Sequence, residues 1–131
     1  ARVAPGNEIF ANYTWQKDPE VEEIDMADVN LPPTNRFNVG MAGSVRGLMY
    51  SAVVAYQDEA FWSDVLDSRF HGVTEKMTTL NLTLGYELEN INFSVRATNV
   101  TNQLFQQHYV GDVIGRRVVA EAGLNFDWDN R

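Results

Sequence analysis

The sequence predicts an all-β fold: an antiparallel, up-and-down transmembrane β-barrel segment of about six strands, with short periplasmic turns and long extracellular loops. Apolar residues recur at every second position along most of the chain, and helical periodicity is hard to find. The expected strands are about ten residues long, which suffices to cross a bilayer at a tilt of about 45°. Their connections alternate between short and long, as in membrane barrels.

Each expected strand places apolar and polar side chains on opposite faces. The clearest example has Leu80, Leu82 and Leu84 on one face, with Asn81 and Thr83 on the other. Because successive side chains of a strand point to opposite sides, this spacing predicts a sheet with one apolar face. The same alternation marks six stretches, residues 9–15, 37–46, 48–57, 79–88, 92–98 and 117–126.

The connections between these stretches differ in length. Those at residues 46–47 and 89–90 are hairpin-tight, although neither has the Asn-Gly pair that favours a type I′ turn. The other three, residues 17–34, 58–76 and 102–115, are long, and we expect them to lack regular structure. Compact soluble domains rarely hold several such loops, whereas outer-membrane barrels place them on the outer side.

The alternation alone suits a soluble barrel or sandwich as well as a membrane barrel. Two features favour the membrane: the apolar faces carry no charge over their central five positions, and the polar faces are rich in small uncharged residues. A third feature is the placement of aromatic residues toward the strand ends, as in the girdles of membrane barrels. These aromatic residues are Tyr13, Trp15, Phe37, Tyr56, Tyr86, Phe126 and Trp128.

Composition narrows the function classes. The 131 residues include 10 Lys and Arg against 18 Asp and Glu, and a net charge of −8 at pH 7 makes nucleic acid a poor partner. The chain has no cysteine, which excludes a disulfide framework and a thiolate metal site. No apolar run approaches the length of a transmembrane helix, and the N-terminus lacks the apolar core of a signal peptide. No catalytic motif is present, so we expect no enzyme activity and no cofactor.

Three segments carry motifs with a family resemblance. Residues 97–103 read Ala-Thr-Asn-Val-Thr-Asn-Gln, residues 111–118 read Gly-Asp-Val-Ile-Gly-Arg-Arg-Val, and residues 31–40 read Leu-Pro-Pro-Thr-Asn-Arg-Phe-Asn-Val-Gly. In this arrangement they resemble the C-terminal part of the TonB-dependent outer-membrane receptors. In these receptors a segment like 97–103 closes the penultimate strand, and one like 111–118 ends the final extracellular loop and opens the last strand. A segment like 31–40 starts a strand. The resemblance covers essentially the whole chain.

The resemblance implies uptake of a scarce, bulky nutrient across the bacterial outer membrane, such as an iron–siderophore, cobalamin or a glycan. The chain would contact outer-membrane lipid and a plug domain, and a TonB complex would act on it indirectly through that plug. Residues 1–131 are expected to form a single barrel segment without the plug. Because the family's barrels have 22 strands and six strands cannot close, we expect the remaining strands in a longer receptor or in other chains.

Two other functions fit the same pattern of strands. The first is a small stand-alone or oligomeric outer-membrane barrel with a structural or adhesive role, which a mature chain of only 131 residues would favour. The second is a soluble β-barrel that binds a small apolar ligand, which solubility without detergent would favour.

Candidate substrate-binding residues lie in the long loops. His71 and His108 are the only histidines, and imidazole is a common metal ligand, but no spacing signature links them. Trp62, Phe105 and Tyr109 are large aromatic residues at the expected outer tips. They either stack on a ligand, as aromatic pocket linings do, or they extend strands beyond the membrane or pack the loops together.

Charged residues suggest two further features. Arg96, Arg117, Glu87 and Glu121 fall on polar faces, where they line the lumen wall to dock a plug or guide substrate, or else pair with one another across strands. The connection 17–34 carries carboxylates of a kind that suits calcium, but their spacing matches no EF-hand, which favours a solvated acidic loop and no metal site. These carboxylates belong to Asp18, Glu20, Glu22, Glu23 and Asp25.

Overall fold

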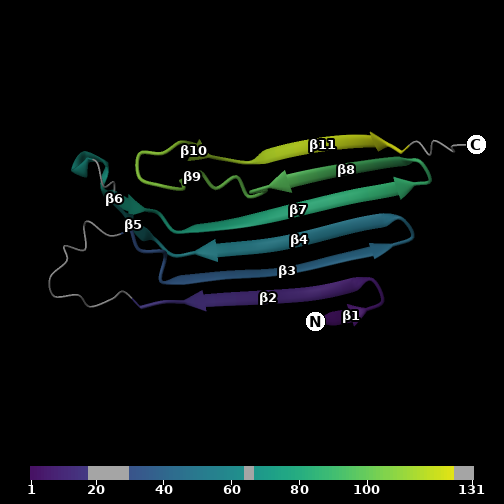
Figure 1. Cartoon of the computed structure of the whole chain (residues 1–131), viewed down its shortest axis with the longest axis horizontal. Coiled ribbons are helices and arrows are strands. Elements are labelled where there is room, and N and C mark those ends of the chain that lie inside the picture. The colour runs from purple at the N-terminus through teal and green to yellow at the C-terminus, as the bar shows by residue number, and fades with distance from the viewer. Residues whose placement is uncertain (18–29, 64–66, 126–131) are drawn as a thin grey trace, which may run out of the picture.

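The computed structural model describes residues 1–17, 30–63 and 67–125. They form a curved, antiparallel, seven-stranded sheet with the strand order β1-β2-β3-β4-β7-β8-β11, open at both edges (Figure 1). The all-β class predicted from the sequence is confirmed. The strands of this sheet are β1 (Arg2–Ala4), β2 (Asn7–Trp15), β3 (Asn35–Val45), β4 (Leu48–Gln57), β7 (Met77–Leu88), β8 (Ile91–Thr98) and β11 (Arg117–Leu124).

Six of these strands match the six stretches of alternating residues, and only β1 is missed by the sequence pattern. It pairs with β2 through a tight turn in which Gly6 has a φ of 73°. With three residues, β1 is too short to show alternation. Within the described ranges the only helix is the 3-10 turn η2 (Ser68–Phe70), and no helix there has the length and apolar character needed to cross a membrane.

Two of the long connections contain small hairpins. Between β4 and β7, β5 (Ala60–Trp62) pairs with β6 (Gly72–Thr74). Between β8 and β11, β9 (Phe105–Gln106) pairs with β10 (Val113–Ile114). The expectation that these connections lack regular structure is therefore wrong, because strands of two or three residues are too short to reveal a period of two.

The two ends of the sheet differ in how the strands are joined. Tight turns at residues 5–6, 46–47 and 89–90 lie at one end, called the turn end here, and the long connections lie at the opposite loop end (Figure 1). Arg46 and Gly47 both have positive φ, 48° and 82°, as a type I′ turn requires. An Arg-Gly pair thus adopts the turn that Asn-Gly usually forms.

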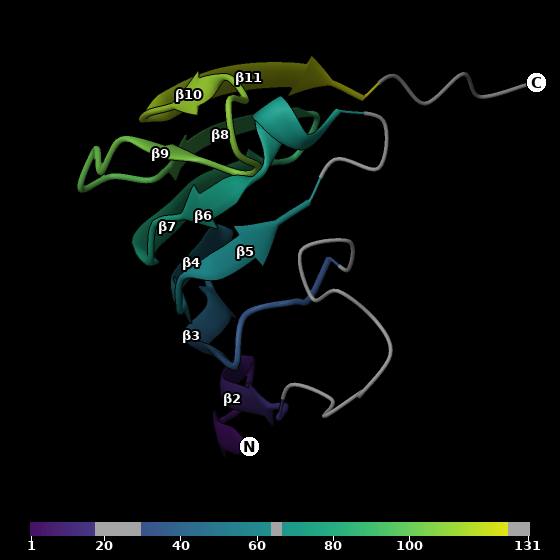
Figure 2. The same ribbon diagram turned by 90° about the vertical axis from the view of Figure 1, so that its left-hand side faces the viewer.

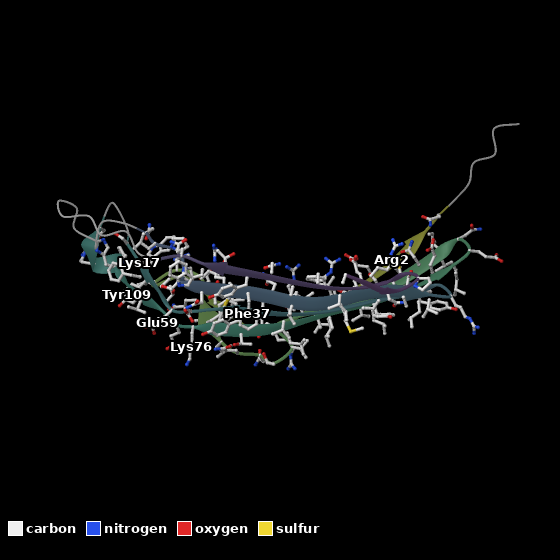
Figure 3. All side chains as sticks on the ribbon, turned by 90° about the horizontal axis from the view of Figure 1, so that it is seen from below. Arg2, Lys17, Phe37, Glu59, Lys76 and Tyr109 are labelled. Carbon is white, nitrogen blue, oxygen red and sulfur yellow. The ribbon has the colours of Figure 1, made fainter. Side chains whose placement is uncertain are left out.

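Strand register places the apolar residues of six strands on one face, as predicted. Residues paired across neighbouring strands share a face, and the row at mid-height is wholly apolar. This row consists of Ile9, Met41, Ala52, Leu82, Ala97 and Val118. Figure 3 shows that the apolar face is convex, whereas polar side-chain tips lie along the concave face in the middle of the sheet.

The described residues place no second layer over the convex face. Leu84 and Val118 on that face are 55% and 60% exposed, and Phe105 is the only buried hydrophobic residue in the described ranges. A sheet of a soluble domain hides its apolar face against a second layer. An uncovered apolar surface of this extent marks contact with a membrane or with another protein.

Aromatic rows bound the convex face at both ends. At the loop end Tyr13, Phe37 and Tyr56 lie side by side, and the rings of Phe37 and Tyr56 stack with their centroids 5.0 Å apart. Near the turn end Tyr86 of β7 pairs with Phe93. Tyr86 lies eight residues along β7 from Thr78, which is the β7 partner of Tyr56. At about 3.4 Å per residue and a tilt of about 40°, this spacing gives a band about 20 Å tall, close to the band of about 25 Å in outer-membrane barrels.

Candidate functional site

Most of the candidate substrate-binding residues come together at the loop end, where the hairpins β5–β6 and β9–β10 lie side by side (Figure 2). The ring centroids of Trp62 and His108 are 5.3 Å apart, with the two planes tilted by 37°. The ring of Tyr109 lies on Gly72, where an added Cβ would fall 2.2 Å from Cε2 of the tyrosine. A larger residue at position 72 would have to displace this ring, so the hairpins approach each other closely.

His71 joins this loop-end cluster from the β5–β6 hairpin. Its ring meets Phe61 edge-on at 6.2 Å, and its Nε2 lies 3.3 Å from the hydroxyl of Ser63. Ser63 is only 1% exposed, and its backbone exchanges two hydrogen bonds with the side-chain amide of Asn30. In one of them Asn30 Nδ2 donates to the Ser63 carbonyl oxygen at 2.7 Å. The side-chain amide of Asn30 therefore fixes the backbone of Ser63, the residue that follows β5.

Two hollows of about 330 and 490 Å³ open beside the loop-end cluster. Both volumes fall in the range of small-molecule sites, and their linings combine aromatic rings with a few polar groups. Such a lining suits a ligand with planar rings. The smaller hollow is lined in part by Pro32, Phe61, Trp62, Thr74 and Gln107, and the larger by Val73, Phe105, Gln106, Tyr109 and Val113.

The five predicted substrate-binding residues thus all belong to the loop-end cluster or to its hollows, and their role in binding stays a prediction. Phe105 is only 8% exposed, so little of its ring is free to contact a ligand. Among the described residues no three histidine, cysteine or acidic side chains gather closely enough to hold a metal ion. Other candidates lie outside the described residues, namely Asp18, Glu20, Glu22, Glu23, Asp25, Phe126 and Trp128.

The four predicted lumen-wall residues all lie on the concave face. Residues paired across strands point to the same face, and the pairs that contain Glu87 and Arg96 place both on the concave face. Arg117 and Glu121 of β11 pair with residues of β8 on this same face. Glu121 accepts a hydrogen bond from the hydroxyl of Ser94 at 3.3 Å. Within the described ranges no ion pair joins these four residues to one another.

Asn99 has a structural role that its sequence motif alone does not predict. It directly follows β8, is 3% exposed and has a φ of 51°, a left-handed conformation that asparagine tolerates. Its side-chain amide donates to the Gln103 carbonyl oxygen at 2.8 Å and accepts the Gln103 N–H at 3.2 Å. Its own N–H donates to Asn81 Oδ1 at 2.9 Å. The motif at 97–103 is therefore a hydrogen-bonded turn that fixes the exit from β8.

A second network ties the aromatic row at the loop end to β3. The hydroxyl of Tyr56 donates to Asp58 Oδ1 and Asn35 Nδ2 donates to Asp58 Oδ2, both at 2.6 Å, while the hydroxyl of Tyr13 donates to Asn35 Oδ1 at 2.6 Å. The hydrogen bond from Tyr56, followed by that from Asn35, lowers the pKa of the Asp58 carboxyl below its ordinary value. The network holds both tyrosine hydroxyls toward the loop end, the orientation of tyrosines at a membrane interface.

Comparison with known proteins shows a likeness at the level of fold. No protein-family model matches the chain, and no curated protein matches it. Among solved structures, the crystal structure of the ferric-catecholate import receptor Fiu from E. coli K12, in a closed form, is similar with a TM-score of 0.72 and 19% sequence identity. The match covers 95% of this chain and 19% of that receptor chain, so the chain spans about a fifth of its length.

Proposed function

We propose that this chain is part of the wall of a bacterial outer-membrane receptor of the TonB-dependent type. The observation that carries the proposal is the convex face, where apolar residues of six strands stand in register between two aromatic rows and no described residue covers them with a second layer. Bilayer hydrocarbon covers such a face without a second protein layer, and outer-membrane barrels have this arrangement. The likeness in fold to an import receptor supports the same proposal.

The receptor would import a scarce, bulky nutrient and carry out no chemistry on it. The loop-end cluster would contact the cargo, since Trp62, His108 and Tyr109 meet there beside the two hollows. An iron–siderophore is the first cargo class to test, because the structural neighbour is a ferric-catecholate import receptor. Cobalamin and a glycan are the other two classes.

The proposal assigns a different partner to each surface of the sheet. The convex face would meet outer-membrane lipid, and the concave face would meet a plug through which a TonB complex acts indirectly. The open edges at β1 and β11 present unpaired backbone groups, which the remaining barrel strands would cover. No nucleic acid is expected as a partner, because the net charge is −8.

The first test is the denatured intact mass of the native protein, extracted with detergent from outer membranes. The proposal predicts a mass far above 14.8 kDa, with this sequence forming part of a longer chain. A mass near 14.8 kDa would contradict the receptor assignment and leave a small or oligomeric barrel in its place.

A second test measures transport directly. Cells that carry or lack the receptor are supplied with a labelled ferric siderophore, labelled cobalamin or a labelled oligosaccharide. We expect receptor-dependent uptake of one of them, and we expect that collapse of the proton gradient across the inner membrane abolishes it. Receptor-independent entry of all three cargo classes would contradict the transport function.

A further inference from the structure

The smaller hollow at the loop end, of about 330 Å³, lies toward the inner side of the wall. Gln57 lines it and belongs to the concave face, because an odd number of positions along β4 separates it from Ala52 of the apolar row. Figure 2 shows β5, which forms another part of the lining, on the inner side of the arc of strands. A cargo inside the wall would therefore meet this hollow.

The described lining of this hollow carries no charged side chain. Its polar groups are amides and one hydroxyl, and its apolar part includes the rings of Phe61 and Trp62. Arg36, which pairs with Gln57 in the register, does not line it. A site built for an anion presents guanidinium or ammonium groups to its ligand. This lining therefore suits an uncharged ligand.

Two of the amides in the lining are free to bind a ligand. The amide of Asn30 bonds to the backbone that follows β5, and the hydroxyl of Thr74 donates to the backbone of β5 at 3.1 Å. The side-chain amides of Gln57 and Gln107 form no hydrogen bond in the described part of the chain. Each offers two donors and an acceptor. One comes from the end of β4 and the other from the β9–β10 turn, so they approach a ligand from different elements.

The charge of the loop end also argues against an anionic cargo. The connections 17–34, 58–76 and 102–115 contain 12 acidic and 3 basic side chains, a net charge of −9, whereas the whole chain carries −8. A field of this sign slows the approach of an anion. A ferric catecholate is an anion, because its catecholate oxygens carry more negative charge than the ferric ion neutralises. The cargo named for the structural neighbour is thus a poor match to this hollow.

Size and surface chemistry separate the two remaining cargo classes. A volume of about 330 Å³ is at the lower end for small-molecule sites, which is small for the corrin macrocycle of cobalamin but sufficient for the end of a chain-like ligand. A sugar ring carries C–H bonds on its faces and hydroxyl groups at its rim. Trp62 is 36% exposed, and the negative face of an aromatic ring attracts such C–H bonds. The free amides match the hydroxyl groups, each of which donates and accepts.

We propose that the smaller hollow binds a terminal sugar of a neutral glycan, with Trp62 stacked on the sugar ring and Gln57 and Gln107 hydrogen-bonded to its hydroxyl groups. This inference rests on the proposed function and selects one of its three cargo classes. It assigns specificity to shape and uncharged hydrogen bonds, and the acidic connections act against anionic competitors.

The test uses the intact receptor, extracted from outer membranes in detergent. It is applied to an array of neutral malto-, cello-, xylo- and manno-oligosaccharides, and the ferric complex of a simple catechol is the anionic probe. We expect at least one neutral oligosaccharide to bind and the ferric complex not to bind. Calorimetry of the bound oligosaccharide should give a Kd that changes by less than about twofold when the ionic strength is raised, because no charge takes part.

Substitutions locate the binding. Trp62→Ala should raise the Kd by about tenfold, and Trp62→Tyr, which keeps a ring, should restore most of the affinity. Gln57→Ala and Gln107→Ala should each raise it by about fivefold, and neither removes a side-chain hydrogen bond of the fold. Phe70→Ala is the matched control, since Phe70 is an exposed ring at the loop end outside both hollows, and it should leave the Kd unchanged.

The outcomes separate this inference from the proposed function. Each receptor is first assayed for the unheated gel mobility of a folded barrel, and a chain that never assembles in the membrane counts against the proposed function. An assembled receptor that binds the ferric complex and no neutral oligosaccharide overturns this inference alone. Oligosaccharide binding that is indifferent to Trp62→Ala and to both glutamine substitutions also overturns it, because the sugar then lies elsewhere.

Discussion

The two faces of the sheet are built by the same six strands, yet they are suited to different surroundings. On the convex face apolar residues continue from strand to strand, and Val118 at the edge is as open as Leu84 in the interior, at 60% and 55% exposure. The concave face carries charges and amides, and its one large ring, Phe10, lies over Gly40, where an added Cβ would meet it at 2.6 Å. This difference supports the proposal that the sheet separates two media, since its described residues enclose no apolar core.

The largest expected effect comes from reversing the character of the convex face. Leu82→Arg at mid-height should cost about 2–4 kcal/mol and block membrane assembly, because a charge would face hydrocarbon. Ser51→Arg, on the neighbouring strand and the opposite face, should leave assembly intact. The measurement is the amount of folded protein in outer-membrane fractions. Equal assembly of the two variants would remove the distinction between the faces.

The second effect concerns the turn that ends β8, because a slip of one residue would exchange the two faces. Asn99→Ala removes the paired hydrogen bonds to Gln103 and leaves a less tolerant residue at positive φ. We expect a loss of about 1–3 kcal/mol, measured by urea unfolding in detergent. Asn99→Gly tolerates the positive φ but loses the hydrogen bonds, so its free energy of unfolding should lie between those of the parent and of Asn99→Ala. A parent-like midpoint for Asn99→Ala would contradict this role.

A smaller effect is expected at the turn end. Gly47 has a φ of 82°, and an added Cβ would lie 2.7 Å from the carbonyl oxygen of Glu87. Gly47→Ala should therefore lower the free energy of unfolding by about 1 kcal/mol or more. Arg46→Gly, at a φ of 48°, is the matched control and should be tolerated. If both substitutions behaved alike in urea unfolding, the type I′ assignment would be wrong.

The smallest expected effect concerns Asp58, whose hydrogen bonds hold the aromatic row at the loop end. The pKa of Asp58 is lowered, first by the Tyr56 hydroxyl, so its network stabilises the fold above the ordinary carboxyl value of 3.8. That stabilisation is lost as pH falls below 3.8 through the lowered pKa. The difference in urea midpoint between the parent and Asp58→Asn should therefore shrink from pH 5 to pH 3. A difference that stays constant would show that the carboxylate has no part in it.

The sequence predicts the wall better than the loop end, for a physical reason. Long strands repeat the same alternation many times, so β7 and its partners are found with their faces correctly assigned. The loop-end cluster depends on hairpins of two or three residues and on single contacts, such as Tyr109 over Gly72. Nothing local in the sequence links Trp62 with His108, because their contact arises only when two hairpins meet. Asn99 had a usable signal, an asparagine directly after a strand, but no partner could be named from sequence.

The measurement that tests the central claim most directly is a spin-label scan along β7 in receptor reconstituted into lipid bilayers. Residues 1–131 contain no cysteine, so each single cysteine substitution at positions 79–86 adds the one thiol of this segment, in a receptor whose cysteines elsewhere, if present, are replaced by serine. Even-numbered positions should be accessible to oxygen dissolved in lipid, and odd-numbered positions to a water-soluble nickel reagent or to neither, with a period of two. Uniform access of the nickel reagent to both sets would contradict a lipid-facing convex surface.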